Sequence, residues 1–193
     1  STYWKWANQA TWTGHDNEPT NAPDFGTIGA AYCGAYEDEA DDLCWVTGLG
    51  YGNAWCQQLV SPQQLYTGGG AQIEFKYFND TEIDYDYTKV QIELTNSAGV
   101  PLNFSGFTGK IGLAGDHPAS APTGEIVSYS ISDGDVQGQP WFKIVFEMES
   151  DGGWSDQDGL YSTDYGPFGV DDVDVSGAGV LDITYLFETG LVD

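Results

Sequence analysis

Apolar and polar residues alternate along most of this chain. Residues 71–78 place Ile73, Phe75 and Tyr77 on one face and polar side chains on the other. The same alternation recurs over residues 87–94, 124–131, 141–149 and 180–187. This period of two is typical of half-buried strands in an antiparallel sheet.

Turn residues separate the predicted strands. Clusters of Gly, Asn and Asp lie at residues 68–70, 96–99, 133–135 and 151–153, and such clusters mark turns. No window has a sustained helical stripe, and no repeat or linker divides the 193 residues. We therefore predict an all-β fold, an antiparallel two-sheet β-sandwich of jelly-roll type, with residues 1–193 as one domain.

The first 30 residues differ from the rest because they are rich in Trp and Asn. We expect a strand here that either lies at the edge of its own sheet or is exchanged with a neighbouring chain, with Trp4 and Trp6 as anchors. Exchange between copies of the chain would build an extracellular filament, which is the alternative function that we consider.

The charge of the chain excludes several partners. Thirty acidic residues face five basic ones, all lysines, and the net charge is −25. Nucleic acids and anionic membranes bind through Lys and Arg contacts to phosphate, so neither is expected as a partner. No apolar run approaches the roughly 18 residues that membrane insertion needs. The acidity favours divalent cations and an extracellular or cell-surface location.

Three cysteines, Cys33, Cys44 and Cys56, are present. Their spacing fits no zinc pattern. Cys33 and Cys44 bracket an acidic loop, and we predict that they form a disulfide. The alternative is that all three are buried thiols.

Residues 147–175 are the best candidate for a metal site, because nine of these 29 residues are Asp or Glu. Carboxylates held close together repel one another unless a cation lies between them, and oxygen ligands suit Ca²⁺. The predicted ligands are Asp151, Asp156, Asp158, Asp171 and Asp172. The alternative is a solvated acidic loop whose Asp residues form turns. A second pair, Asp84 and Asp86, is interpreted as a simple polar face at the start of a strand.

Among the seven tryptophans, the best candidate for contact with a ligand is Trp154, which we expect in a loop beside these acidic residues. Trp154 could stack against a sugar ring, although Trp residues of a sandwich more often belong to its core. The partners expected from the sequence are a glycan or protein ligand, or copies of the chain itself.

Several short motifs occur in the order found in a known family. They are Ala-Tyr-Cys-Gly at 31–34, Gly-Tyr-Gly-Asn-Ala-Trp-Cys at 50–56, Asp-Tyr-Asp-Tyr at 84–87, Ser-Asp-Gly-Gly-Trp at 150–154 and Phe-Gly-Val-Asp-Asp-Val at 168–173. In this the chain resembles the MAM-like, jelly-roll domains appended to large secreted bacterial proteins, including immune-inhibitor-type metalloproteases. The resemblance implies a non-catalytic sandwich, often calcium-bearing near the pair Asp171 and Asp172, without the protease.

We expect no enzymatic activity. A His-Glu-x-x-His motif and a Gly-x-Ser-x-Gly motif are both absent. The size and composition also allow a small jelly-roll glycoside hydrolase, which would need two carboxylates across a cleft. Among the strand glutamates (Glu74, Glu93, Glu147 and Glu149), no pair is singled out by the pattern.

Overall fold

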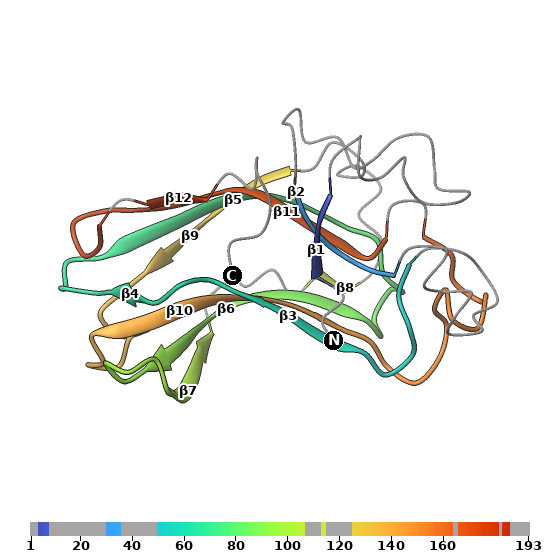
Figure 1. The fold of residues 1–193 in the computed structure, drawn as a ribbon, viewed down its shortest axis with the longest axis horizontal. Helices are drawn as coiled ribbons and strands as arrows, with labels where there is room; N and C mark the ends of the chain where they lie inside the picture. Colours follow the sequence, from blue (N-terminus) through green and yellow to red (C-terminus); the bar gives the residue numbers. More distant parts are fainter. Residues whose placement is uncertain are drawn as a thin grey trace.

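The described residues of the chain form two antiparallel β-sheets that pack face to face (Figure 1). The computed structural model describes residues 4–7, 30–35, 50–106, 113–114, 125–163, 166–181 and 183–185. The first sheet contains β1 (Trp4–Ala7), β2 (Ala30–Cys33), β5 (Ala71–Asn79), β9 (Glu125–Ile131), β11 (Phe168–Ser176) and β12 (Ile183–Tyr185). The second contains β3 (Cys56–Val60), β4 (Gln64–Leu65), β6 (Tyr87–Thr95), β7 (Pro101–Gly106), β8 (Leu113–Ala114) and β10 (Trp141–Glu149).

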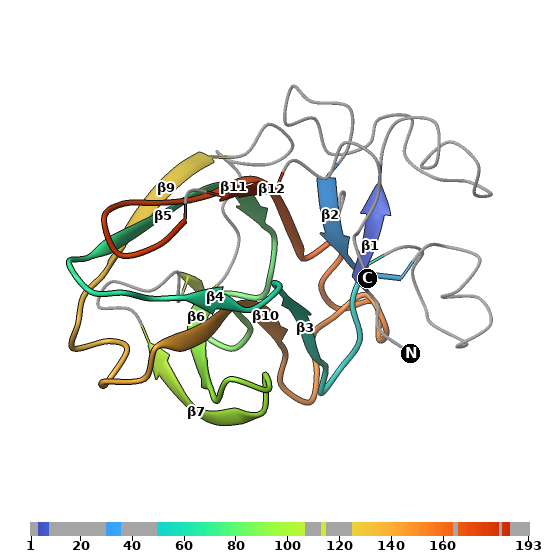
Figure 2. The same ribbon diagram turned by 60° about the vertical axis from the view of Figure 1, so that its left-hand side comes forward.

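The order of the strands is that of a jelly roll. Strands β2-β11-β5-β9 form the central part of the first sheet and β3-β10-β6-β7 form that of the second (Figure 2). Strands β1, β4, β8 and β12 are short additions to these sheets. Among these eight central strands, each successive strand lies in the other sheet except β7, which pairs with β6 in the second sheet. This alternation is typical of a jelly roll. The predicted antiparallel β-sandwich of jelly-roll type is confirmed.

The core lies between the sheets and follows the alternation read from the sequence. Ile73, Phe75 and Tyr77 of β5 are buried, and so are Val90, Ile92 and Leu94 of β6. Phe75 of the first sheet meets Phe146 of the second edge to face, with ring centroids 5.1 Å apart. Burial of each such side chain contributes about 1.5–3 kcal/mol, so these residues hold the two sheets together.

Strand β11 contains a bulge that moves its side chains from one face to the other. Its pairing with β5 is regular up to Asp171 and resumes at Asp174, and Asp172 has a φ of 50°. Phe168 and Val170 precede the bulge, Val173 and Val175 follow it, and all four are buried in the core. A regular strand would have turned the second pair outward, because residues 170 and 173 are an odd number of positions apart.

The N-terminal strand pairs with its own chain. Trp4 of β1 lies opposite Cys33 of β2, and Ala7 lies opposite Ala30. The side chains of Trp4 and Trp6 lie outside the described residues, so their role as anchors stays a prediction.

Two of the three cysteines can be placed. Cys33 is buried in β2 and Cys56 is exposed at the start of β3. The idea that all three are buried thiols is therefore wrong for Cys56. Cys44 lies outside the described residues, and its disulfide with Cys33 stays a prediction.

The connections lie where the turn residues predict them, at 68–70, 96–99, 133–135 and 151–153. Of the last predicted strand, the described residues include β12 (Ile183–Tyr185). In the part of the chain that the structure describes, no helix is long and apolar enough to cross a bilayer.

Candidate metal centre

Three segments that are far apart in the sequence meet at one end of the sandwich, on the right in Figure 1. They are residues 50–55 before β3, residues 80–86 between β5 and β6, and residues 150–163 after β10. Backbone hydrogen bonds tie them together, for example from Ser150 N to Trp55 O at 2.9 Å and from Gln157 N to Tyr51 O at 3.3 Å. The segments therefore form a hydrogen-bonded cap on this end of the core.

A tight turn brings acidic residues together within this cap. The Asp86 N–H donates to the Glu82 carbonyl at 3.2 Å, and Asp84 within the turn has a φ of 69°. Asp tolerates this left-handed conformation better than most residues. The turn delivers Asp86 to the first position before β6, close to the end of β10.

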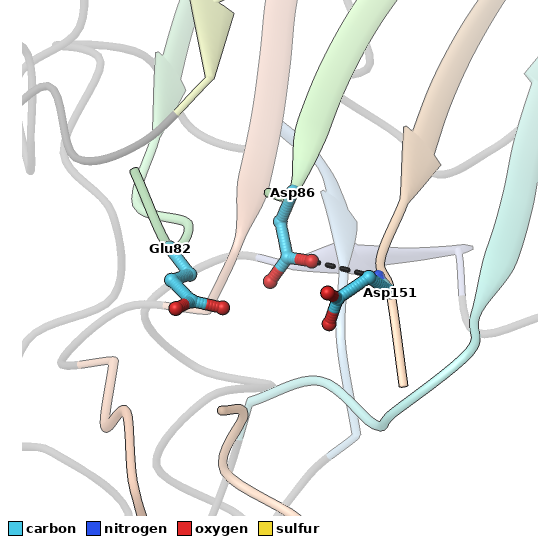
Figure 3. Close-up of side chains that lie close together, drawn as sticks. All are labelled: Glu82, Asp86 and Asp151. Atoms are coloured by element: carbon cyan, nitrogen blue, oxygen red, sulfur yellow. Dashed lines mark hydrogen bonds between the residues drawn. The ribbon is translucent and has the colours of Figure 1, made fainter. Parts of the chain in front are cut away.

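Three carboxylates converge here: those of Glu82, Asp86 and Asp151 (Figure 3). One oxygen from each lies within 4.8 Å of the others. Asp86 is fully buried, Glu82 is half-buried and Asp151 is exposed. We call these three residues the acidic triad. Its open side is the side of Asp151, so an ion could enter from solvent.

Asp86 is the fixed centre of the acidic triad. Its Oδ1 accepts a hydrogen bond from Asp151 N at 2.8 Å, and its Oδ2 accepts one from the Tyr51 hydroxyl at 2.6 Å. That same hydroxyl accepts from Glu82 N at 3.2 Å. Tyr51 therefore positions two members of the triad, and each Asp86 oxygen keeps a lone pair for a further partner.

The electrostatics of the acidic triad disfavour three negative charges without a counterion. Burial raises the pKa of Asp86, against the lowering effect of its hydrogen bonds from Tyr51 and Asp151. Burial and the neighbouring charges of Asp86 and Asp151 also raise the pKa of Glu82. Among the described residues, the nearby Lys89 is instead paired with Glu147 at 3.4 Å and with Glu149. A cation between the three carboxylates would relieve the repulsion.

The donor set suits a hard cation. Three carboxylates without His or Cys match Ca²⁺ or Mg²⁺ rather than zinc or copper. Oxygens that share one Ca²⁺ at about 2.3–2.6 Å are at most about 5 Å apart, a limit that the triad meets. Water would complete the shell of six to eight oxygens.

Of the five ligands predicted from the sequence, the structure places one, Asp151, in the acidic triad. Asp156 is buried and accepts hydrogen bonds from Tyr51 N at 2.9 Å and from both the N–H and the hydroxyl of Thr163, at 2.9 and 3.2 Å. Its two oxygens thus hold residues 150–163 against residues 50–55.

Asp158 has a similar structural role. Its oxygens accept from the N–H groups of Trp154, Ser155 and Leu160 at 2.9–3.1 Å and from the Asn53 side chain at 3.0 Å. These donors lower the pKa of Asp158. A carboxylate with four donors is suited to fixing a loop.

The last two predicted ligands lie in the bulge of β11. Asp171 is fully buried and Asp172 is half-buried. Within the described ranges, neither belongs to a group of three acidic, His or Cys side chains close enough to share an ion. Trp154, the predicted stacking residue, is 55 % exposed, and its stacking against a ligand stays a prediction.

Sequence reasoning missed Glu82 and treated Asp86 as part of a polar face. A signal for Asp86 was present: Val90, Ile92 and Leu94 face the core, and counting back in steps of two puts Asp86 on the same face. A carboxylate on a core face needs a partner. The partner could not be read from the sequence, because Asp151 lies 65 positions further along the chain.

No protein-family model matches this chain, and no curated protein shows significant similarity to it. The fold and the site themselves define the class: an all-β jelly-roll sandwich with a carboxylate cluster at one end.

Proposed function

We propose that this chain is a non-enzymatic, calcium-stabilised β-sandwich module that acts outside the cell or at its surface in binding or adhesion. The acidic triad is the observation that carries the proposal. It gathers three carboxylates on two connections of the sandwich, so a bound ion would join the β5–β6 turn to the segment after β10. A divalent ion that binds the folded cap more tightly than the unfolded chain stabilises the folded state.

Two further features support an extracellular calcium module. The net charge of −25 attracts divalent cations and keeps the chain soluble. The jelly-roll strand order is the fold implied by the resemblance to MAM-like domains. Membership of that family is part of the proposal.

Calcium is preferred to magnesium on geometric grounds. Mg²⁺ demands near-ideal octahedral geometry at about 2.0–2.1 Å, whereas Ca²⁺ accepts irregular shells and longer bonds. Carboxylates spread over as much as 4.8 Å suit the larger ion. Extracellular modules bind Ca²⁺ with dissociation constants of about 10⁻⁴–10⁻³ M.

The test compares thermal unfolding in chelator and in 10 mM CaCl₂. If the dissociation constant is about 10⁻⁴ M, calcium adds about 2.7 kcal/mol, or roughly 5–10 °C in Tm for a chain of this length. Asp151→Asn, an exposed substitution, should fold normally in chelator and lose most of this gain. Asp86→Asn tests the same point from the buried side.

The matched control is Asp171→Ala combined with Asp172→Ala, which removes two acidic residues outside the triad. We expect calcium to raise the Tm of this control, relative to the same variant in chelator, as much as it raises the Tm of the wild-type protein. A loss of the gain in this control but not in Asp151→Asn would move the site to the β11 bulge. No gain in the wild-type protein would remove calcium from the function.

A further inference from the structure

A surface pocket of about 290 Å³ adjoins the acidic triad and shares Asp151 with it. It is lined by Tyr85, Tyr87, Lys89, Glu149, Ser150 and Asp151. These residues come from the start of β6, the end of β10 and the positions next to these strand ends, where Tyr87 lies directly opposite Glu149. The pocket therefore rests on two paired strands, and its volume is near the lower limit of the roughly 300–1,000 Å³ usual for small-molecule sites.

Two tyrosines give the pocket an exposed aromatic surface. Tyr85 is 58 % exposed and Tyr87 is 36 % exposed. The Tyr87 hydroxyl donates to the Asp84 carbonyl at 2.9 Å, which fixes its ring. An aromatic ring that is already fixed costs little entropy to cover, so a ligand with an apolar face gains from burying it.

The pocket also contains both a hydrogen-bond donor and hydrogen-bond acceptors. The Lys89 ammonium, a donor, is held between Glu147 and Glu149. Glu149 and Asp151 present exposed carboxylate oxygens, which are acceptors. Lys89 and Glu149 lie on the paired strands β6 and β10, and Asp151 follows β10, so the pocket offers a donor and acceptors at the same time to neighbouring hydroxyl groups of one ligand.

Charged ligands fit this pocket less well than neutral ones. The two carboxylates and the net charge of −25 repel an anion. The Lys89 ammonium lies 6.0 Å from the centre of the Tyr87 ring, within the range of a cation–π contact, so a second cation over that ring would be repelled.

We propose that this pocket binds a neutral sugar residue of a glycan, with the more exposed ring of Tyr85 as the stacking surface and the fixed ring of Tyr87 as a second apolar contact. The Lys89–Glu149 pair and Asp151 are the hydrogen-bonding partners. The size of the pocket suits one or two sugar rings. The inference deepens the proposed function, since it rests on the chain being a binding module, and it names the class of ligand. Calcium binding is not required for it.

The experiment measures binding to a panel of neutral oligosaccharides built from glucose, galactose, mannose or xylose, first as an array and then by calorimetry at millimolar concentration. Tyr85→Ala should weaken binding of the best ligand at least tenfold, because stacking on this ring is lost. Tyr85→Phe should retain binding within about twofold, since the ring remains. Trp154→Ala is the matched control, an equally exposed aromatic residue outside the pocket lining, and it should bind as the wild type does.

Three results would overturn the proposal. The first is that no neutral oligosaccharide binds. The second is that Trp154→Ala loses binding while Tyr85→Ala binds as the wild type does, and the third is preferential binding of spermine, a polycation included in the panel. Each variant is also unfolded with and without CaCl₂. Sugar binding without a calcium-dependent gain in Tm would contradict the calcium proposal alone. A calcium gain without sugar binding would contradict the sugar site alone.

Discussion

Asp156 is a buried carboxyl group of the cap, and its protonation makes the stability of the protein depend on pH. Burial raises the pKa of Asp156 to about 7, while hydrogen bonds from Thr163 and Tyr51 oppose the shift and the charge of Asp80 adds to it. In the unfolded chain the same group titrates near 4. Between these two values the folded state holds a proton that the unfolded state has released.

The stability of the protein without calcium should therefore depend on pH. The contribution of Asp156 is fully present below about pH 4 and is lost as the pH rises through about 7, because the charged form is disfavoured only in the folded state. We expect the free energy of unfolding, measured with urea in chelator, to rise by about 2–3 kcal/mol between pH 7.5 and pH 5.

Asp156→Asn serves as the comparison because it is neutral at every pH. Its stability should change much less over the same range, with only the smaller contributions of groups such as Glu82 and Asp86 left. A variant with the full wild-type slope would show that another carboxyl group is responsible.

Individual residues also show where sequence reasoning ends. The alternation correctly placed Val90 and Ile92 in the core, because the side-chain period of a strand is independent of what lies across the sheet. It could not bring Glu82 and Asp86 to Asp151, since that contact depends on a turn and on the pairing of β6 with β10. The fold class follows from local patterns, whereas the site requires the tertiary arrangement.

At the scale of the element, β11 departs from a regular strand in a way that the sequence conceals. Phe168-Gly-Val-Asp-Asp-Val-Asp-Val reads as alternation with one residue too many. The bulge accommodates that residue by placing Asp172 in the left-handed region, at a φ of 50°. Asp tolerates this conformation better than β-branched residues do.

At Asp172, we expect Gly to be more stable than Val, the reverse of the usual preference in a strand. Asp172→Val should be less stable than Asp172→Gly by about 1–2 kcal/mol, because a β-branched side chain is strained at positive φ and glycine is not. Both variants lose the same charge, so electrostatics cancel in the comparison. The measurement is chemical unfolding of the two variants in chelator; in a regular strand Val would be the more stable of the two.

For the whole molecule, net charge is the dominant electrostatic property. Thirty acidic residues on 193 positions repel one another in the folded state more than in the expanded chain. Salt screens this repulsion over a Debye length that falls from tens of ångströms at low salt to a few ångströms at 1 M.

Monovalent salt should thus stabilise the chelated protein. We expect Tm to rise by about 3–8 °C between 20 mM and 500 mM KCl, which corresponds to about 1–2 kcal/mol of relieved repulsion. The gain from calcium should shrink in high salt, since both act on the same charges. A Tm that is independent of KCl would show that the acidic side chains are too far apart to destabilise the fold.

The jelly-roll order also determines when this protein can fold. β11 lies inside the first sheet and β10 inside the second, yet both lie in the last third of the sequence, after most of the strands that they join. The pairing of β2 with β11 and of β3 with β10 can form only after residues 141–176 have been synthesised, so neither sheet is complete before then. Pairing of such distant strands is slow. We therefore expect the central strands of this protein to stay without their final partners until late in synthesis, and an incompletely folded polypeptide is the form that can pass through a narrow channel.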